Sequence, residues 1–209
     1  MHSLTEVREM TDFLIATNNA HKVEEFKRIL KPLGINVLSA KEAGFDLGEV
    51  EENGTTFQEN AKIKALSAYR ISSMPSIADD SGLCVDALSG APGIFTARYG
   101  GEGLTQQERN DYLLSNMESV AEENRSARFV CSICCILSEN ECIEVLGTCD
   151  GFVAFSPSGA GGFGYDPVFV YKDGRCFGEI SADEKDKISH RGVALRLLKD
   201  ELTKRKDVL

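Results

Sequence analysis

The chain has 209 residues, 42% of them hydrophobic and 27% charged, as in an ordinary soluble globular protein with one well-buried core. Acidic residues outnumber basic ones by 33 to 23, which gives a formal net charge of −10. No basic stripe suited to a polynucleotide is visible, and no stretch reaches the roughly 18 consecutive apolar residues of a membrane helix. Composition therefore argues against nucleic-acid polymers and membranes as partners. It leaves small phosphorylated ligands open, because a few well-placed lysines can dominate the local field.

The first part of the chain predicts an extension followed by a β-α-β unit. Residues 1–11 are polar and mixed in charge, without the apolar stretch of a secretory signal, so we expect a disordered extension and a cytoplasmic protein. The run Phe13–Ala16 is typical of a buried strand, and residues 23–30 place their apolar side chains on one helical face. A proline and a glycine close this helix, and residues 35–38 predict a second strand.

The middle of the chain predicts a loop, two helices and a strand. Residues 39–54 are acidic and contain glycine, as loops do. Thr56 and Glu59 fit a capping box, and we expect the helix that it opens to end near Ser72. A short strand at residues 76–78 leads to a pair of aspartates at its end, and residues 105–118 predict another helix.

The last part of the chain predicts a hairpin, a loop and a helical end. Two strands at residues 126–138 and 142–155 are expected to pair through a turn near Glu139 and Asn140. A glycine-rich loop at residues 159–166 follows, and the stretch from Ser181 is helical. Because helices and strands are mixed without regular alternation, we expect a single α/β domain over residues 1–209 with a mixed β-sheet.

The seven cysteines include a C-x-x-C pair, Cys131 and Cys134, whose spacing suggests a zinc or redox site. The surrounding residues 128–137 read as a buried strand, in which neighbouring side chains point to opposite faces. No second pair with metal-like spacing follows. The pattern therefore favours reduced, buried cysteines that act as small hydrophobic residues.

A polar turn, Thr17–Lys22, joins the first strand to the first helix. Backbone N–H groups at a helix N-terminus favour anions, and Lys22 adds a positive charge suited to phosphate oxygens. The turn lacks the glycine framework and the Lys-Ser/Thr ending of a Walker loop. It is either a phosphate-binding loop or a polar turn in which an asparagine caps the helix.

Two adjacent carboxylates, Asp79 and Asp80, follow the predicted strand at residues 76–78. Adjacent carboxylates repel each other unless a cation or solvent separates them. Mg²⁺ prefers oxygen ligands and bridges carboxylates to a substrate phosphate, and Glu51 and Glu52 lie in an acidic loop that could supply a further ligand. The alternative is a pair of solvated aspartates in a turn.

Two later stretches suit recognition of a flat ligand. Residues 161–167 place three glycines around two aromatic rings, so that the backbone approaches a ligand while a ring stacks on it. The alternative is a tight turn with a packing aromatic residue. Residues 189–192, with Lys185 upstream, bring donor and cationic groups near a helix, where the alternative is a solvated charge cluster.

Together these stretches resemble the inosine triphosphate pyrophosphatase family of nucleotide house-cleaning enzymes. The resemblance spans residues 12 to 200 and follows the family's order. One departure is Asn18, which stands where many relatives carry a glycine and makes the turn slightly stiffer. The stretches that carry the resemblance are residues 17–22, 51–61, 77–83, 90–93, 96–99, 161–167 and 188–192.

The resemblance implies a two-lobed α/β fold with a long mixed central β-sheet flanked by helices and an active site in the cleft between the lobes. It implies hydrolysis of non-standard purine nucleoside triphosphates (ITP, dITP and XTP) to the nucleoside monophosphate and pyrophosphate, with Mg²⁺ as the cofactor. It also implies a homodimer and a role in removing deaminated purines from the nucleotide pool.

The resemblance also assigns residues to roles. Asp80 is the proton acceptor and a metal ligand. Asp79, Glu51 and Glu52 complete the acidic metal site, and which glutamate points inward is left open. The triphosphate end is assigned to Thr17, Asn18, Asn19, Ala20, His21, Lys22 and Lys64, and Ser81 also contacts the substrate. The nucleoside end is assigned to Phe163, whose ring stacks on the base, and to Gly164, Tyr165, Asp166, Lys185, His190 and Arg191.

Base choice has a physical basis in the C6 substituent. Hypoxanthine and xanthine carry an acceptor oxygen at C6, where adenine carries an amino donor. A pocket of donors, including Arg191 and backbone N–H groups near Phe163, binds the oxygen and rejects adenine by roughly 10⁴-fold. Guanine shares the C6 oxygen, so its exclusion depends on the 2-amino group, through crowding or an unpaired donor. The sequence leaves open which residue excludes it.

Three alternative functions remain open on the sequence alone. The first is a pyrophosphatase for dUTP, dTTP or another modified triphosphate, against which the elements at residues 161–167 and 189–192 favour a purine. The second is a nucleotide-binding regulator without catalysis, against which the complete set of acidic and phosphate-binding residues favours an enzyme. The third is a zinc or redox module built on Cys131 and Cys134.

Overall fold

A six-stranded mixed β-sheet forms the centre of the computed structural model, which describes residues 11–205. Its strand order is β2-β1-β3-β4-β5-β6, with β1 parallel to β2 and β3 and all later neighbours antiparallel. The predicted mixed α/β sheet is confirmed. The strands are β1 (Thr11–Ile15), β2 (Ile35–Ser39), β3 (Ser76–Val85), β4 (Ser126–Ser138), β5 (Glu141–Val153) and β6 (Phe169–Val170).

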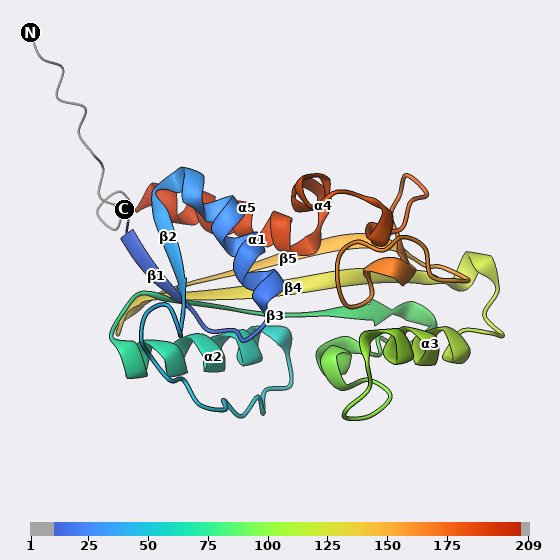
Figure 1. Cartoon of the computed structure of the whole chain (residues 1–209), viewed down its shortest axis with the longest axis horizontal. Helices are drawn as coiled ribbons and strands as arrows, with labels where there is room; N and C mark the ends of the chain where they lie inside the picture. The colour runs from blue at the N-terminus through green and yellow to red at the C-terminus, as the bar shows by residue number, and fades with distance from the viewer. Residues whose placement is uncertain (1–10, 206–209) are drawn as a thin grey trace, which may run out of the picture.

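Helices cover both faces of this sheet, which Figure 1 shows nearly edge-on. In that view α1, α4 and α5 lie above the sheet, and α2 and α3 lie below it. The short 3₁₀ helix η3 (Gly93–Arg98) packs against β3. The α-helices are α1 (Ala20–Leu30), α2 (Phe57–Ser72), α3 (Gln106–Asn116), α4 (Ala182–Ile188) and α5 (His190–Lys204).

The helices begin at polar caps that the sequence signals. Asn19 caps α1 with its side chain, and Thr56 and Glu59 form the predicted capping box of α2. The predicted C-terminal helix is two helices, because Ser189 adopts an extended conformation between them. Its backbone N–H ends α4 and its hydroxyl accepts from the N–H of Gly192 to begin α5. One serine therefore turns the chain so that residues 190 and 191 enter the protein interior.

The described residues form three hydrophobic clusters, two of which lie on opposite faces of the sheet, and the cysteines follow the strand alternation. Cys131 lies in the core under α1 and α5, whereas Cys134 lies in the core over α2. All seven cysteines are free. Burial raises the pKa of Cys134 to about 12, which keeps the thiol protonated at neutral pH. The predicted burial holds for five of the seven cysteines, whereas Cys84 is half-buried and Cys142 is exposed; their reduced state stays a prediction. Two thiols on opposite faces of the sheet cannot bind one zinc ion.

Two expectations about strand ends need correction. Asp79 and Asp80 lie within β3 and not at its end, because β3 pairs with β4 along its whole length, up to Val85. The expected extension over residues 1–11 lies outside the described residues except for Thr11. Thr11 begins β1, where its N–H donates to the carbonyl of Gly34.

The partial pairing of β1 leaves part of the sheet edge open. β1 pairs with β3 only at Ser76 and Ile77. From Ala78 onward, the side of β3 that faces away from β4 has no neighbouring strand among the described residues until the turn at Ala91 and Pro92 reaches its far end. The residues around Asp80 therefore lie at an open edge in the middle of the protein.

A close contact between β5 and α5 gives a test of this packing. A Cβ atom at Gly147 would lie 2.2 Å from the carbonyl oxygen of His190 and 2.5 Å from the backbone nitrogen of Ala194. We expect Gly147→Ala to lower the free energy of unfolding by roughly 3 kcal/mol, because the backbone of α5 must move. Urea denaturation measures this. The control Thr148→Ala changes an exposed neighbour and is expected to cost less than about 0.5 kcal/mol; equal midpoints for the two variants would contradict the packing.

Candidate functional site

A pocket of about 720 Å³ lies along the open edge of β3. Its walls come from the turn between β1 and α1, the loop at residues 47–52, α2, η3, α3 and the loop at residues 163–166. Segments from above and below the sheet in Figure 1 therefore meet at one cavity. The open strand edge is what allows this, because a further paired strand would fill the space.

The turn between β1 and α1 forms one end of the pocket. Asn19 caps the helix by accepting from the N–H groups of His21 (3.0 Å) and Lys22 (3.4 Å), and its own N–H donates to the hydroxyl of Thr17 (3.2 Å). Every residue of the turn Thr17–Lys22 lines the pocket, with the exception of Ala20. The turn therefore does both things that the sequence offered as alternatives: Asn19 caps α1, and the turn faces the pocket.

Asp79 lies behind the pocket wall and is only 1% exposed. Its Oδ2 atom lies 3.0 Å from Lys22 Nζ and accepts from Arg191 Nε (3.2 Å) and Nη2 (3.1 Å). Burial acts to raise the pKa of Asp79, but Lys22 and Arg191 hold it well below its usual range. Asp79 is therefore ionised and neutralises two cations, and a direct metal contact for it stays a prediction.

Asp80 points to the other side of β3 and lines the pocket. Lys64 Nζ donates to Asp80 Oδ1 (2.9 Å) and to Glu52 Oε2 (3.1 Å), and the amide of Asn60 is 3.4 Å from Asp80 Oδ2. Burial raises the pKa of Asp80, although Lys64 opposes this. A carboxylate with a raised pKa is the better proton acceptor.

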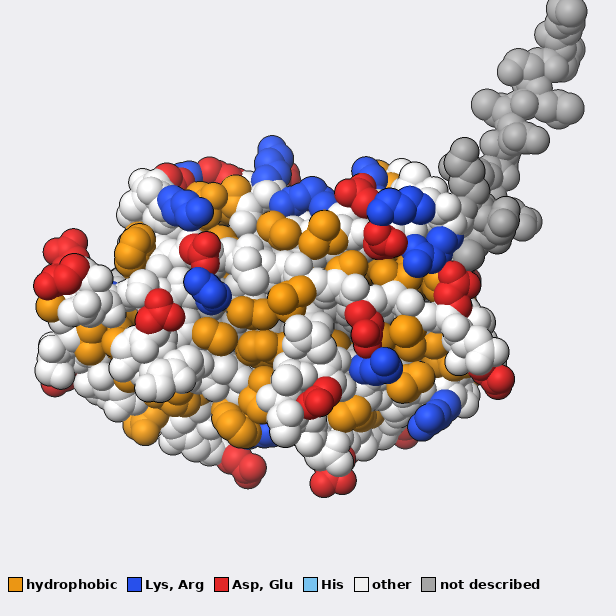
Figure 2. Space-filling model, turned by 180° about the vertical axis from the view of Figure 1, so that it is seen from behind, with side chains coloured by type: hydrophobic (Ala, Val, Ile, Leu, Met, Phe, Trp, Pro, Cys, Tyr) orange, Lys and Arg blue, Asp and Glu red, His pale blue; other side chains and the backbone are white. Residues whose placement is uncertain are grey.

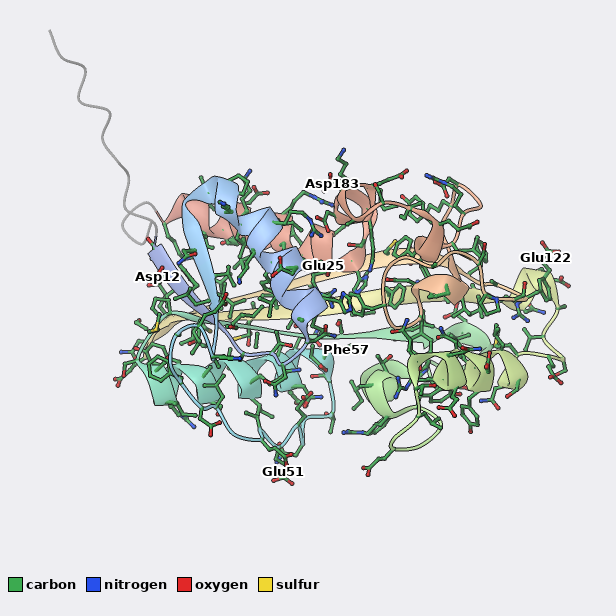
Figure 3. The ribbon with its side chains drawn as sticks, in the orientation of Figure 1. Asp12, Glu25, Glu51, Phe57, Glu122 and Asp183 are labelled. Atoms are coloured by element: carbon green, nitrogen blue, oxygen red, sulfur yellow. The ribbon has the colours of Figure 1, made fainter. Side chains whose placement is uncertain are left out.

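The loop before α2 distinguishes the two glutamates. Glu52 lines the pocket and shares Lys64 with Asp80. Glu51 does not line it and lies at the outer tip of the loop in Figure 3. Geometry therefore favours Glu52 as the inward-pointing residue.

The other end of the pocket is built around the ring of Phe163. His21 stacks on this ring with centroids 5.2 Å apart and planes 11° apart, and Lys185 Nζ lies 4.6 Å from the ring centre. Asp166 Oδ2 accepts from Lys185 Nζ (2.6 Å) and from the backbone N–H of Phe163 (2.7 Å). Gly162 has a positive φ of 73° and no room for a Cβ beside Asp166. The glycine therefore lets this loop fold onto its own carboxylate.

His190 and Arg191 reach the same end from the start of α5. The ring of His190 is buried and stacks on Phe129 at 4.6 Å between centroids. Burial, and next the charge of Arg191, lower the pKa of His190 well below its usual value, so the ring is neutral. Arg191 Nη2 donates to the hydroxyl of Ser81 (2.9 Å). Both residues line the pocket, and the structure thus brings together the nucleoside-end residues that the sequence singled out.

Sequence reasoning missed Glu25, which is 7% exposed on α1. Its carboxylate accepts from Arg191 Nη1 and lies 3.5 Å from Lys185 Nζ, and Figure 3 shows it in the middle of the helix. The sequence signal that could have identified Glu25 is its position three residues after Lys22, on the same face of the helix. Sequence reasoning also assigned no role to the six pocket-lining residues of η3 and α3, four of them polar: Ile94, Thr96, Ala97, Arg98, Gln106 and Arg109.

Comparisons with known proteins agree on one family. The chain matches the Ham1 family model over residues 13–201. It is 46% identical to a dITP/XTP pyrophosphatase of Clostridium perfringens, which covers 92% of this chain and 98% of that protein. It is 44% identical to a dITP/XTP pyrophosphatase of Bacillus subtilis, with 90% and 96% covered.

Solved structures show the same fold. A HAM1 protein from Coxiella burnetii superposes with a TM-score of 0.84 at 38% identity, covering 93% of this chain and all of that one. The Ham1 protein of Staphylococcus aureus gives a TM-score of 0.83 at 37% identity, with the same coverage. The predicted fold class is confirmed, while the division into two lobes stays a prediction.

Glu25 provides a test of the buried charges. We expect Glu25→Ala to lower the free energy of unfolding by roughly 3 kcal/mol, because Arg191 and Lys185 lose a buried counter-charge. Chemical denaturation of this variant is compared with Glu24→Ala, which changes the exposed neighbour and is expected to alter stability by less than about 0.5 kcal/mol. Similar losses in both variants would show that Glu25 does not hold the two cations.

Proposed function

Because the chain belongs to the Ham1 family, we propose that it hydrolyses non-standard purine nucleoside triphosphates, namely ITP, dITP and XTP, to the monophosphate and pyrophosphate. The observation that carries the proposal is a single pocket with a carboxylate and two lysines at one end and a stacking ring at the other. These ends suit a triphosphate and a purine base respectively. Hydrolysis of these triphosphates removes deaminated purines from the nucleotide pool.

The reaction places water on the α-phosphorus. A bond forms from the water oxygen to phosphorus, the bond from phosphorus to the bridging oxygen breaks, and pyrophosphate leaves. Asp80 accepts the proton of the water, for which its raised pKa suits it. Lys22 and Lys64 neutralise the charge that develops on the leaving pyrophosphate, and both lie in the pocket wall.

Mg²⁺ fits the acidic side of this pocket. Glu52 and Asp80 contact one lysine nitrogen, so their oxygens converge on the same region. Among residues 11–205 no group of three or more His, Cys, Asp or Glu side chains could hold a metal, but Mg²⁺ usually takes one or two carboxylates together with substrate phosphates. We assign Glu52 and Asp80 to the ion. When bound, Mg²⁺ supplies positive charge to the triphosphate and acidifies water.

The base end selects purines with an oxygen at C6. We assign the ring of Phe163 to stacking on the base, in place of the His21 ring that stacks on it in this structure; such stacking gives affinity without discrimination. Lys185 Nζ lies over that ring, 4.6 Å from its centre, and its ammonium group donates to an acceptor oxygen at C6 but not to the amino group of adenine. Because Asp166 and Glu25 fix the position of this ammonium, a mismatched base cannot easily turn it away.

We further propose a cytoplasmic homodimer. None of the helices in residues 11–205 is long and apolar enough to cross a membrane. Figure 2 shows the side of the molecule behind the view of Figure 1, where apolar side chains spread over the middle of the surface among scattered charges. Strand β5, which pairs with β6 only at Phe152 and Val153, exposes Leu146 and Phe152, 43% and 47% accessible. These side chains support an association of two copies.

Pyrophosphate release tests the function directly. With Mg²⁺ present, we expect turnover of ITP and XTP to exceed that of GTP, ATP and dUTP at matched concentrations. Asp80→Asn is expected to lower kcat roughly 100-fold or more, because the variant cannot accept the proton. Near-normal turnover in this variant would rule out Asp80 as the proton acceptor. A preference for dUTP would overturn the base assignment, and no turnover of any triphosphate would favour a binding protein.

A matched pair of variants tests the metal site. Glu52→Gln is expected to lower kcat/KM roughly tenfold or more and to raise the Mg²⁺ concentration needed for half-maximal rate. Glu51→Gln is expected to stay within about twofold of the unmodified protein, because Glu51 points outward. Removing divalent cations with EDTA should abolish turnover, and adding Mg²⁺ should restore it. The reverse order of the two variants would place Glu51 at the ion.

A further inference from the structure

Residues of η3 and α3 line the pocket together with the loop that carries Phe163. They are Thr96 and Ala97 of η3, Arg109 of α3, and Gly164 and Tyr165 of the loop. Two hydrogen bonds hold these parts of the wall together. The hydroxyl of Tyr165 donates to the carbonyl of Thr96 (3.2 Å), and the amide of Asn110 donates to the carbonyl of Gly164 (3.1 Å). The position of α3 is therefore fixed relative to the loop that carries Phe163.

Arg109 is partly buried in this wall, and few groups satisfy it. Its Nη2 donates to the carbonyl of Leu104 (3.0 Å), whereas its Nε is buried and finds no partner among the described residues. No carboxylate of residues 11–205 lies within 4.0 Å of its guanidinium. Burial raises the pKa of Tyr165 and the charge of Arg109 opposes this, which places the guanidinium near the phenol.

The other partly or fully buried cations of the pocket differ from Arg109. Each of them contacts at least one carboxylate: Lys22, Lys64, Lys185 and Arg191. Arg98 also has no carboxylate partner in the described part of the chain, but it is exposed and stacks on Phe95. A guanidinium that is partly buried without a counter-charge carries a desolvation cost. The Nε atom is enclosed, so an acceptor on a ligand in the pocket would reach the guanidinium at its Nη atoms and supply the missing counter-charge.

The substrate presents such an acceptor on the side that faces α3. Lys185 and Arg191 approach Phe163 from α4 and α5, which lie above the sheet in Figure 1, whereas α3 lies below it. A purine that stacks on Phe163 with its C6 oxygen toward these two cations turns its C2 and N3 atoms toward α3. The three relevant bases differ at C2: xanthine carries an oxygen, hypoxanthine a hydrogen, and guanine an amino group.

We propose that Arg109 contacts the C2 edge of the base and makes XTP the preferred substrate. The proposal rests on the proposed function and names the substrate that this site prefers. The guanidinium donates to the C2 oxygen of xanthine. It gains little from the hydrogen of hypoxanthine, and it faces a donor in guanine, so it also excludes GTP. Xanthosine loses its N3 proton near neutral pH, which adds negative charge to the edge that faces this cation.

The test is the ratio of kcat/KM for XTP to that for ITP, measured with one preparation of each variant. A misfolded fraction lowers both values equally and leaves the ratio unchanged. In Arg109→Gln we expect the ratio to fall by about tenfold to a hundredfold, because a charge-assisted hydrogen bond is lost. The value for ITP should stay within about threefold. Arg109→Lys retains the charge and should lose less of the ratio, and Arg128→Gln, which removes an exposed cation on β4, should leave it unchanged.

Each outcome decides the matter. A selective loss of XTP turnover in Arg109→Gln supports the proposal. An equal loss for XTP and ITP shows that Arg109 only anchors α3 through Leu104 and overturns it, as does an unchanged ratio. In both of these cases the proposed function stands, because the triphosphates are still hydrolysed. If the unmodified protein hydrolyses neither ITP nor XTP, the proposed function fails first and the role of Arg109 fails with it.

Discussion

An ionised carboxylate buried in the middle of the sheet determines how the rest of the site is held. Asp79 accepts from both Lys22 and Arg191, which come from helices at opposite ends of the chain. Arg191 also contacts Glu25, and Glu25 contacts Lys185. Lys185 in turn contacts Asp166, in the loop that carries Phe163. Positive and negative groups therefore alternate without a break. The series is Lys22, Asp79, Arg191, Glu25, Lys185 and Asp166.

Such a series is better understood as a positioning device than as a source of stability. Buried ion pairs seldom exceed the stability of a well-packed apolar cluster, but removing one member leaves its partners uncompensated in a medium of low dielectric. Each of the four inner charges is therefore confined to one place by two neighbours of opposite sign. Because the series joins α1, β3, α5 and α4 to one another and to Asp166, it fixes the phosphate end and the base end of the pocket relative to each other.

Strand geometry explains why two adjacent aspartates have different properties. From the sequence, we expected Asp79 and Asp80 to lie at the end of a short strand, and that placement was wrong. Both lie inside β3, where successive side chains point to opposite faces. Asp79 faces the cations of α1 and α5, which lower its pKa, whereas burial raises that of Asp80, which faces α2. One step along the strand thus separates the ionised Asp79, which positions two cations, from Asp80, the potential proton acceptor.

How much the sequence predicts depends on the range of the signal. The α2 capping box, the opening β-α-β unit and the opposed thiols of Cys131 and Cys134 rest on neighbours a few residues apart, and all three were predictable. Glu25 was missed because its partners lie 160 residues or more away in the chain. The open edge of β3 was missed for a related reason: nothing local shows where β1 stops pairing. That edge is nevertheless what lets residues above and below the sheet reach one ligand, so the feature with the weakest local signal is the one on which the pocket depends.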